Sequence, residues 1–188
     1  MARPVEYDRD MVLRNATRVF WLKGYQSASM ADLLDATGLT SRSLYNIFGS
    51  KNGLFKAALE TYYQGGFGPA LAKLEAGQGR EAVQEYVRSM TNGGEPLNGC
   101  LFVNTLADKT AVEEDAFEIV SGFFNRLEQV LKERLTYARK HQAFKGDPGV
   151  TAARLVVFLQ GLGVYSKMNP GSGDHGRLAL EFLELIGV

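Results

Sequence analysis

Residues 40–46 of this 188-residue chain place hydrogen-bonding side chains along one short stretch. An arginine can make two parallel hydrogen bonds to a guanine, and hydroxyl and amide groups can bind phosphates or base edges. Leu44 and Phe48 fall at helical spacing on the other side of this stretch and are expected to face inward. Arg42 is therefore a candidate for a contact to a guanine or to a phosphate. The residues here that we expect to contact DNA are Thr40, Ser41, Arg42, Ser43, Tyr45 and Asn46.

The residues before this stretch carry signals for another helix and a tight turn. Ser29 is a helix-capping residue type, and Asp32 three positions later completes a Ser-x-x-Asp start signal. Gly38 suits a helix end that needs a positive φ, and Thr40 suits the cap of the next helix. These signals together predict a helix, a tight turn and a second helix. Such a motif can place its second helix in the major groove of DNA, which is about 12 Å wide. An ordinary helical hairpin is the competing interpretation, but its outer face more often carries glutamate and lysine.

Three further residues beside these helices are candidates for phosphate contacts. A helix N-terminus attracts anions, which makes the backbone amides of Ser29 and Met30 candidates. Lys51 opens the next predicted helix, where the helix dipole disfavours a cation. A phosphate partner therefore explains Lys51 better than a structural role does.

The run from Val12 to Leu59 resembles the DNA-binding domain of the TetR family of bacterial transcription regulators. The matching positions are Gly24-Tyr25, Ser29, Gly38-Leu39, Leu44-Tyr45, Phe48 and Ser50-Lys51. A Gly-Cys-Leu-x-Val-Asn run that begins at Gly99 is similar to one subgroup of the same family. The resemblance implies a regulator that binds a palindromic operator as a homodimer and releases it when a small molecule binds. A repressor is favoured over an activator, because blocking a promoter requires only binding.

Two departures from the family pattern lie in this region. Ile47 stands where the family usually has histidine or tyrosine, which removes one expected phosphate contact. Asn52-Gly53 replaces a commoner acidic pair, which is expected to weaken the start of the helix that begins near Ser50.

Composition sets limits that agree with a helical regulator of the reducing cytoplasm. Lysine and arginine balance aspartate and glutamate at 21 each, with a net charge of +2 over residues 1–60 and −2 over the remainder. A single cysteine excludes an intramolecular disulfide. The polar N-terminal residues do not resemble a signal peptide, and no apolar run is expected to reach the roughly 18 residues of a membrane span.

The pattern predicts an all-α fold of about nine helices. Residues 1–60 are expected to form a three-helix helix-turn-helix head, whose first helix is capped by Asp8 and closed by Gly24. Residues 61–188 form a larger helical ligand-binding and dimerisation body. Arg3 precedes the head as either a solvated tail or an arm that contacts DNA. The expected helices from Lys51 onward are Lys51 to a kink or break at 65–69, then 70–75, 80–90, 99–108, 112–142, 150–168 and 176–186, with loops at 92–96 and 143–149.

Residues 150–168 are apolar almost all round, so one side can pack in the protomer and the other against a second copy. A central core helix would show the same pattern, although the family's dimer-forming helices resemble this pair of segments. The expected dimer contacts are Leu155, Leu159, Leu162, Gly163, Leu178, Phe182 and Leu185.

The resemblance also implies a ligand pocket among the helices of the body. The abundance of phenylalanine and the scarcity of charge there indicate a mainly apolar or aromatic small molecule. Each candidate could equally be ordinary core. The candidates are Tyr63, Phe67, Met90, Phe102, Leu106, Phe123, Phe124, Phe158 and Tyr165.

Two other functions are compatible with single features of the sequence. Cys100, near a predicted helix start, could react with an electrophile or oxidant, although a lone cysteine without a neighbouring base is more often a buried apolar residue. A helical ligand-binding scaffold that does not bind DNA is the other alternative. No catalytic residue, metal site or cofactor is expected, because the two histidines have no partner set and no nucleotide-binding motif occurs.

Overall fold

The computed structural model describes residues 7–91, 99–168 and 174–188, and over these ranges the fold is all-α as predicted. Arg3 and the predicted loop at 92–96 lie outside the described residues. The elements are α1 (Arg9–Ser27), α2 (Met30–Thr37), α3 (Ser41–Phe48), α4 (Lys51–Tyr62), the π-helical turn η1 (Tyr63–Phe67), α5 (Gly68–Ala76), α6 (Gly79–Thr91), α7 (Leu101–Ala107), α8 (Glu114–His141), α9 (Pro148–Met168) and α10 (Asp174–Leu185). The prediction of about nine helices agrees with these elements when α4 and α5, which η1 joins, are counted as one helix.

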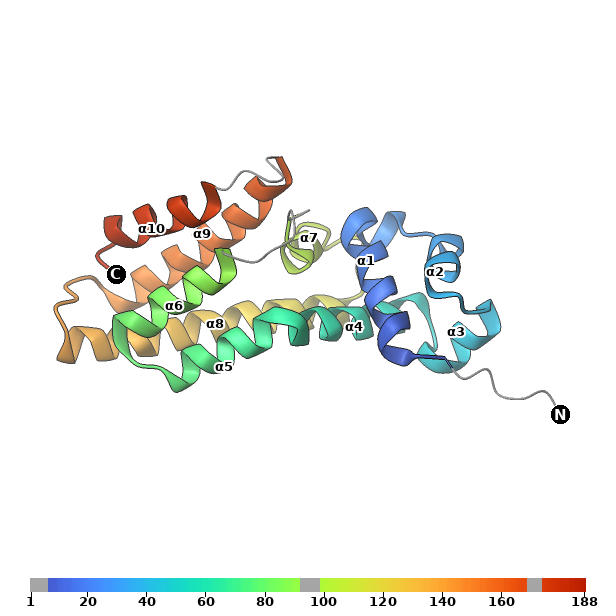
Figure 1. Cartoon of the computed structure of the whole chain (residues 1–188), viewed down its shortest axis with the longest axis horizontal. Coiled ribbons are helices and arrows are strands. Elements are labelled where there is room, and N and C mark those ends of the chain that lie inside the picture. Colours follow the sequence, from blue (N-terminus) through green and yellow to red (C-terminus); the bar gives the residue numbers. More distant parts are fainter. Residues whose placement is uncertain (1–6, 92–98, 169–173) are drawn as a thin grey trace.

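Helices α1, α2 and α3 gather at one end of the elongated molecule, and α4 runs from this head into the body (Figure 1). Asp8 caps α1, since its carboxylate accepts hydrogen bonds from the amides of Asp10 and Met11 at 3.0 and 3.1 Å. Gly24, at φ 78°, breaks the helical conformation where the sequence predicted the end of the first helix. Phe20 is fully buried and anchors α1 against Phe55 of α4, with ring centroids 4.8 Å apart.

The chain between α4 and α5 stays helical, in contrast to the predicted kink or break. Residues Tyr63–Phe67 form a π-helical turn, whose wider i→i+5 hydrogen bonding accommodates the two adjacent glycines. The amide of Gly68 closes this turn by donating to the carbonyl oxygen of Tyr63. The wider π-helical turn therefore joins α4 to α5 directly, and no loop separates the two helices.

The long helix α8 is the centre of the body and packs against α9, α6, α4 and α7. Its buried side recurs at helical spacing from Ala116 to Ala138, as predicted. The following loop is shorter than expected, because α9 already begins at Pro148, a residue suited to the first turn of a helix. Asp147 supports this start by accepting a hydrogen bond from the amide of Val150 at 2.8 Å.

The sequence predicted no apolar run as long as a membrane span, and the length and composition of helix α9 contradict that expectation. Among the described helices, α9 is the one whose length and composition would allow a membrane span. Only 28% of the 18-residue apolar segment within it is buried in the protomer. Val157 and Met168 are 67% and 76% exposed. One side of α9 therefore belongs to the core, whereas the other presents an apolar surface.

Candidate DNA-binding face and ligand cavity

The start of α2 is fixed by a reciprocal pair of contacts between Ser29 and Asp32. The Ser29 hydroxyl accepts from the Asp32 amide at 3.1 Å, and the Asp32 carboxylate accepts from the Ser29 amide at 3.0 Å, which confirms the predicted capping signal. Hydrogen bonds from Lys23 and then from Ser29 lower the pKa of Asp32 to about 2. The Ser29 amide donates to this carboxylate in the structure, and contacts from Ser29 and Met30 to a phosphate stay predictions.

The helix α3 presents the polar face that the sequence predicted. Gly38 ends α2 at φ 67°, and Thr40 caps α3 by accepting from the Ser43 amide at 3.2 Å. Arg42 is exposed, and no carboxylate of the described residues lies within ion-pair distance of it. Tyr45 is 48% exposed, so about half of its side chain is open to solvent. The outward residues of this face are Ser41, Arg42, Tyr45 and Asn46, with Ser43 half-buried.

Lys51 has partners within the head. Its ammonium lies 4.6 Å from the centre of the Tyr25 ring and donates to the Gln26 carbonyl at 3.4 Å. Partial burial lowers the pKa of Lys51. These contacts give Lys51 a structural role, which the sequence favoured less than a phosphate contact. The contact between Lys51 and a phosphate stays a prediction.

The start of α4 is capped although its first turn has no acidic residue, and a weaker start than an acidic pair would give stays a prediction. The Ser50 hydroxyl accepts from the Gly53 amide at 2.9 Å and caps the helix. The buried Asn52 amide donates to Asp115 of α8 at 2.9 Å, which ties the head end of α4 to the body. A Cβ at Gly53 would overlap the carbonyl oxygen of Phe48, so glycine is needed for the close approach of α3 and α4.

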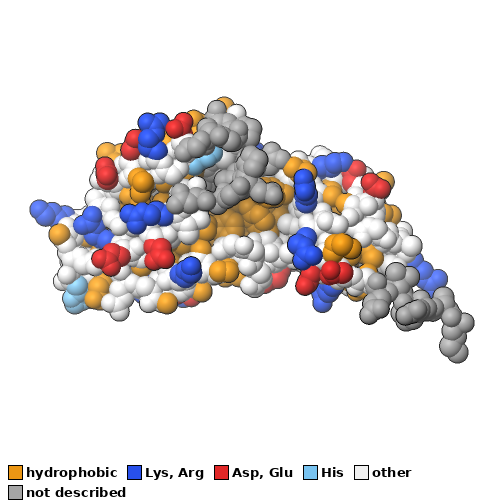
Figure 2. Space-filling model, viewed as in Figure 1, with side chains coloured by type: hydrophobic (Ala, Val, Ile, Leu, Met, Phe, Trp, Pro, Cys, Tyr) orange, Lys and Arg blue, Asp and Glu red, His pale blue; other side chains and the backbone are white. Residues whose placement is uncertain are grey.

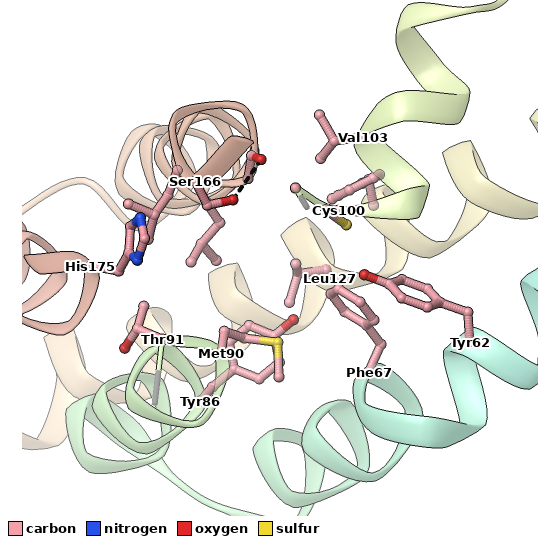
Figure 3. A pocket seen from close by; sticks show the side chains of 15 residues that line it. Tyr62, Phe67, Tyr86, Met90, Thr91, Cys100, Val103, Leu127, Ser166 and His175 are labelled. Carbon is pink, nitrogen blue, oxygen red and sulfur yellow. Dashed lines mark hydrogen bonds between the residues drawn. The ribbon is translucent and has the colours of Figure 1, made fainter. Parts of the chain in front are cut away.

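A cavity of about 660 Å³, including its open mouth, lies in the body between α4, α6, α7, α8 and α9 (Figure 3). Hydrophobic side chains are also visible in the middle of the face drawn in Figure 2, next to α7. None of the described lining residues is an aspartate, glutamate, lysine or arginine. The lining consists of Tyr62, Phe67, Tyr86, Met90, Thr91, Gly99, Cys100, Val103, Phe124, Leu127, Leu159, Leu162, Gly163, Ser166 and His175.

The π-helical turn explains why two aromatic rings five residues apart reach the same cavity. In a π-helix, residues i and i+5 are hydrogen-bonded neighbours on one side, whereas in an α-helix they point in different directions. Tyr62 and Phe67 accordingly lie with ring centroids 5.4 Å apart, and both line the cavity. The π turn thus builds one aromatic wall.

The Cys100 thiol and the two buried tyrosine hydroxyls of the cavity are neutral. Burial raises the pKa of the Cys100 thiol and of the hydroxyls of Tyr62 and Tyr86. The Tyr62 hydroxyl accepts from the Leu101 amide at 3.4 Å and points toward Cys100 (Figure 3). Cys100, at the N-cap of α7, is therefore a protonated thiol in the cavity wall, and a low-pKa nucleophile is disfavoured.

The nine predicted ligand residues divide into three groups. Phe67, Met90 and Phe124 line the cavity. A neighbouring hollow of about 510 Å³, including its open mouth, is lined in part by Tyr63, Phe102 and Phe123. The remaining three line neither space and are Leu106, Phe158 and Tyr165.

Sequence reasoning missed several cavity residues. Tyr86 lies one helical turn before Met90, so the spacing of α6 could have revealed it. His175 carries no such signal, because it reaches the cavity from α10, a distant segment of the chain (Figure 3).

Four predicted dimer residues face the interior of the protomer. Leu155 is fully buried, which excludes it from an outer surface. Leu159, Leu162 and Gly163 line the cavity. The predicted dimer residues that stay at least partly exposed on α10 are Leu178, Phe182 and Leu185.

A capped helix-turn-helix on a helical body with a cavity defines a DNA-binding transcriptional regulator. Residues 12–67 match the family model described as bacterial regulatory proteins, tetR family. These residues carry the DNA-binding domain of the TetR family of transcriptional regulators, as the sequence indicated.

Relatives and solved structures agree with this assignment. The regulator YezE of Bacillus subtilis is 27% identical over 151 residues, 78% of each chain. The transcriptional repressor ComR of Escherichia coli is 32% identical over 129 residues, which are 66% of this chain and 60% of ComR. A cysteine variant of the TetR family regulator CifR, complexed with 26-base-pair operator DNA, superposes with a TM-score of 0.82 and 29% identity over 97% of this chain and 98% of CifR.

Proposed function

We propose that this regulator is a dimeric repressor that binds a palindromic operator and releases it when a small molecule enters the cavity. The observation that carries the proposal is the exposed polar face of α3, with Arg42 at its first turn and caps at both ends. The description of ComR as a repressor and the complex of CifR with operator DNA support it. Ser41, Arg42, Tyr45 and Asn46 are the residues offered to base edges and phosphates.

A second copy of the chain is the proposed partner for the outer side of α9. Val157 and Val164 are exposed on this side, and Gly161 leaves open space for a close helix approach. Leu185 of α10, 81% exposed, extends the same kind of surface. Burying such apolar surface in a two-fold dimer is favourable and would present two heads to half-sites about 34–36 Å apart.

Helix α4 is the proposed mechanical link between cavity and DNA. It begins beside α3, and its last residue, Tyr62, lines the cavity. A ligand that favours a spacing of heads unable to reach both half-sites would shift the population toward the free state. To empty the operator, it must prefer that state by several kcal/mol.

Genomic-fragment selection with purified protein, sequenced and repeated across salt concentrations, tests the proposal. Recovery of one short palindrome, with affinity falling steeply as salt rises, is the expected result because phosphate contacts release counterions. Failure to enrich any fragment would favour a helical ligand-binding scaffold without DNA binding.

Two alternatives are weaker on specific grounds. Sensing through Cys100 is favoured by its place in the cavity wall but disfavoured by the raised pKa of its thiol. A thiol-reactivity assay that finds Cys100 fast-reacting in native protein would revive that mechanism. An enzymatic role has no support from the relatives, which are regulators, and we place the protein in the cytoplasm with its DNA.

A further inference from the structure

The hydroxyl of Tyr86 is buried at the cavity with no hydrogen-bond partner among the described residues. Tyr86 is only 3% exposed, and its side chain extends from α6 toward the cavity (Figure 3). An unpaired buried hydroxyl costs free energy, and such groups in native proteins are rare and call for an explanation. The Nε2 atom of His175, on the α10 side of the same cavity, is likewise buried without a described partner.

We propose that this cavity binds an uncharged, ring-sized apolar molecule that carries one hydroxyl or carbonyl oxygen, held by Tyr86 with His175 as the second polar contact. The inference rests on the proposed function and specifies the chemistry of its effector. Thr91 and Ser166 contribute less to recognition, because each hydroxyl already donates to a carbonyl of its own helix.

The lining selects against an ionised ligand. The described wall contains no lysine or arginine to pair with a carboxylate, and no aspartate or glutamate to pair with an ammonium group. Because an unpaired charge loses its hydration on burial, a charged analogue would bind at a large cost. The Tyr86 hydroxyl stays protonated, since burial raises its pKa, and it can therefore donate to an oxygen of the ligand.

The apolar part of the wall sets the size and shape of the ligand. Phe67 and Phe124 present aromatic rings, and Met90 and Leu127 add flexible and branched apolar surface. Without the open mouth, the enclosed space is about 100 Å³, which restricts the ligand to a small molecule. One or two fused rings with a single polar substituent meet these conditions.

Equilibrium dialysis of the purified full chain against three related probes tests the proposal. The probes are naphthalene, 2-naphthol and 2-naphthoate, which share a ring system and differ in the polar group. We expect 2-naphthol to bind about tenfold more tightly than naphthalene, the effect of one hydrogen bond to a buried group. We expect 2-naphthoate to bind more weakly than 2-naphthol.

Conservative variants assign the effect to the two side chains. Tyr86→Phe keeps the ring and is expected to reduce the preference for 2-naphthol to about twofold or less while naphthalene binding is retained. Tyr137→Phe is the matched control, because Tyr137 is a partly exposed tyrosine of α8 that does not line the cavity, and it should keep the full preference. His175→Leu should weaken 2-naphthol and spare naphthalene.

Each contrary result overturns a stated part of the proposal. Equal binding of naphthalene and 2-naphthol, no binding of either, or tightest binding of 2-naphthoate overturns the ligand class. An unchanged preference in Tyr86→Phe overturns the role of Tyr86, and an unchanged affinity in His175→Leu overturns that of His175. Dialysis contains no DNA, so failure of operator binding in the fragment selection is detected separately from failure of this inference.

Discussion

Trp21 of α1 donates its indole N–H to the carbonyl oxygen of Gly99 at a distance of 3.0 Å. Its ring also meets that of Tyr62 edge-on, with centroids 5.6 Å apart. Gly99 and Tyr62 both line the cavity, so the DNA-binding head contacts the cavity wall directly. This contact is a second connection between the two parts of the molecule, beside the continuous helix α4.

Trp21→Phe tests the importance of this contact. Phenylalanine keeps an aromatic ring but leaves the Gly99 carbonyl without its donor, which should lower the free energy of unfolding by about 1 kcal/mol. The amides at the start of α7 should exchange with deuterium faster. Chemical denaturation and hydrogen-exchange mass spectrometry measure the two effects.

Leu22→Ala is the control for this substitution. Leu22 neighbours Trp21 on α1 but is 54% exposed, so its truncation should change neither stability nor exchange at α7. Equal exchange at α7 in Trp21→Phe and wild type would mean that the indole hydrogen bond does not hold the cavity wall.

Local signals explain why the head was predictable from sequence. Ser29 with Asp32, Gly38 and Thr40 each define a helix end through contacts to residues at most four positions away. Such signals are written in adjacent residues and do not depend on tertiary packing. The predicted start and end of α2 and the start of α3 were therefore correct, whereas α1 continues past its predicted end at Gly24 to Ser27.

The walls of the cavity depend on long-range packing and were only partly predictable. Helix α9 is apolar all round, so no polar side indicated that Leu159 and Leu162 face the cavity while Val157 faces outward. The π turn redirects Phe67, and no residue type specifies such a turn. His175 reaches the cavity only because α10 folds back beside α6.

Gly53→Ala is expected to destabilise the fold by about 1–3 kcal/mol, because the added Cβ overlaps the Phe48 carbonyl oxygen and forces α3 away from α4. Operator affinity should fall as well, since α3 carries the proposed DNA contacts. Gly122→Ala is the control, since a methyl group added at this exposed position of α8 would have no atom within 4 Å and should increase stability. Thermal denaturation of both variants checks the prediction, and equal melting temperatures would contradict it.

Arg42→Ala should weaken specific operator binding by about 1–3 kcal/mol while leaving the fold and the dimer intact, because Arg42 is exposed and has no described carboxylate partner. Fluorescence anisotropy on the selected operator and on a scrambled duplex separates loss of specificity from loss of general affinity. Arg88→Ala, an exposed arginine of α6 remote from α3, should bind like the wild type. Unchanged specificity in Arg42→Ala would refute the proposed contact.

Val157→Asp should raise the dimer dissociation constant at least about tenfold, because it places a carboxylate in the apolar surface proposed to bind the second copy. Operator affinity should fall with it, as a monomer reads a single half-site. Leu22→Asp introduces the same charge at an exposed apolar position of the head and should leave the dimer unchanged. Sedimentation equilibrium measures the dimer dissociation constant of both variants. A Val157→Asp dissociation constant equal to that of the wild type would mean that the interface lies elsewhere.

Asn52→Asp should reverse the pH dependence of the junction between α4 and α8. In the native protein, hydrogen bonds from Lys56 and then from Asn52 lower the pKa of Asp115, so this contribution to stability is present above the ordinary carboxyl pKa and is lost as the pH falls. A second carboxylate beside Asp115 raises the pKa of the pair, so the folded variant binds more protons than its unfolded chain. Its stability should therefore fall as pH rises through the carboxyl range, and the deficit against the native protein should grow from about pH 4 to pH 7.

Asn52→Ala removes the hydrogen bond without adding charge and should show a deficit that varies less with pH. Thermal denaturation across this range decides the matter, since a pH-independent deficit in Asn52→Asp would mean that the two carboxylates do not interact.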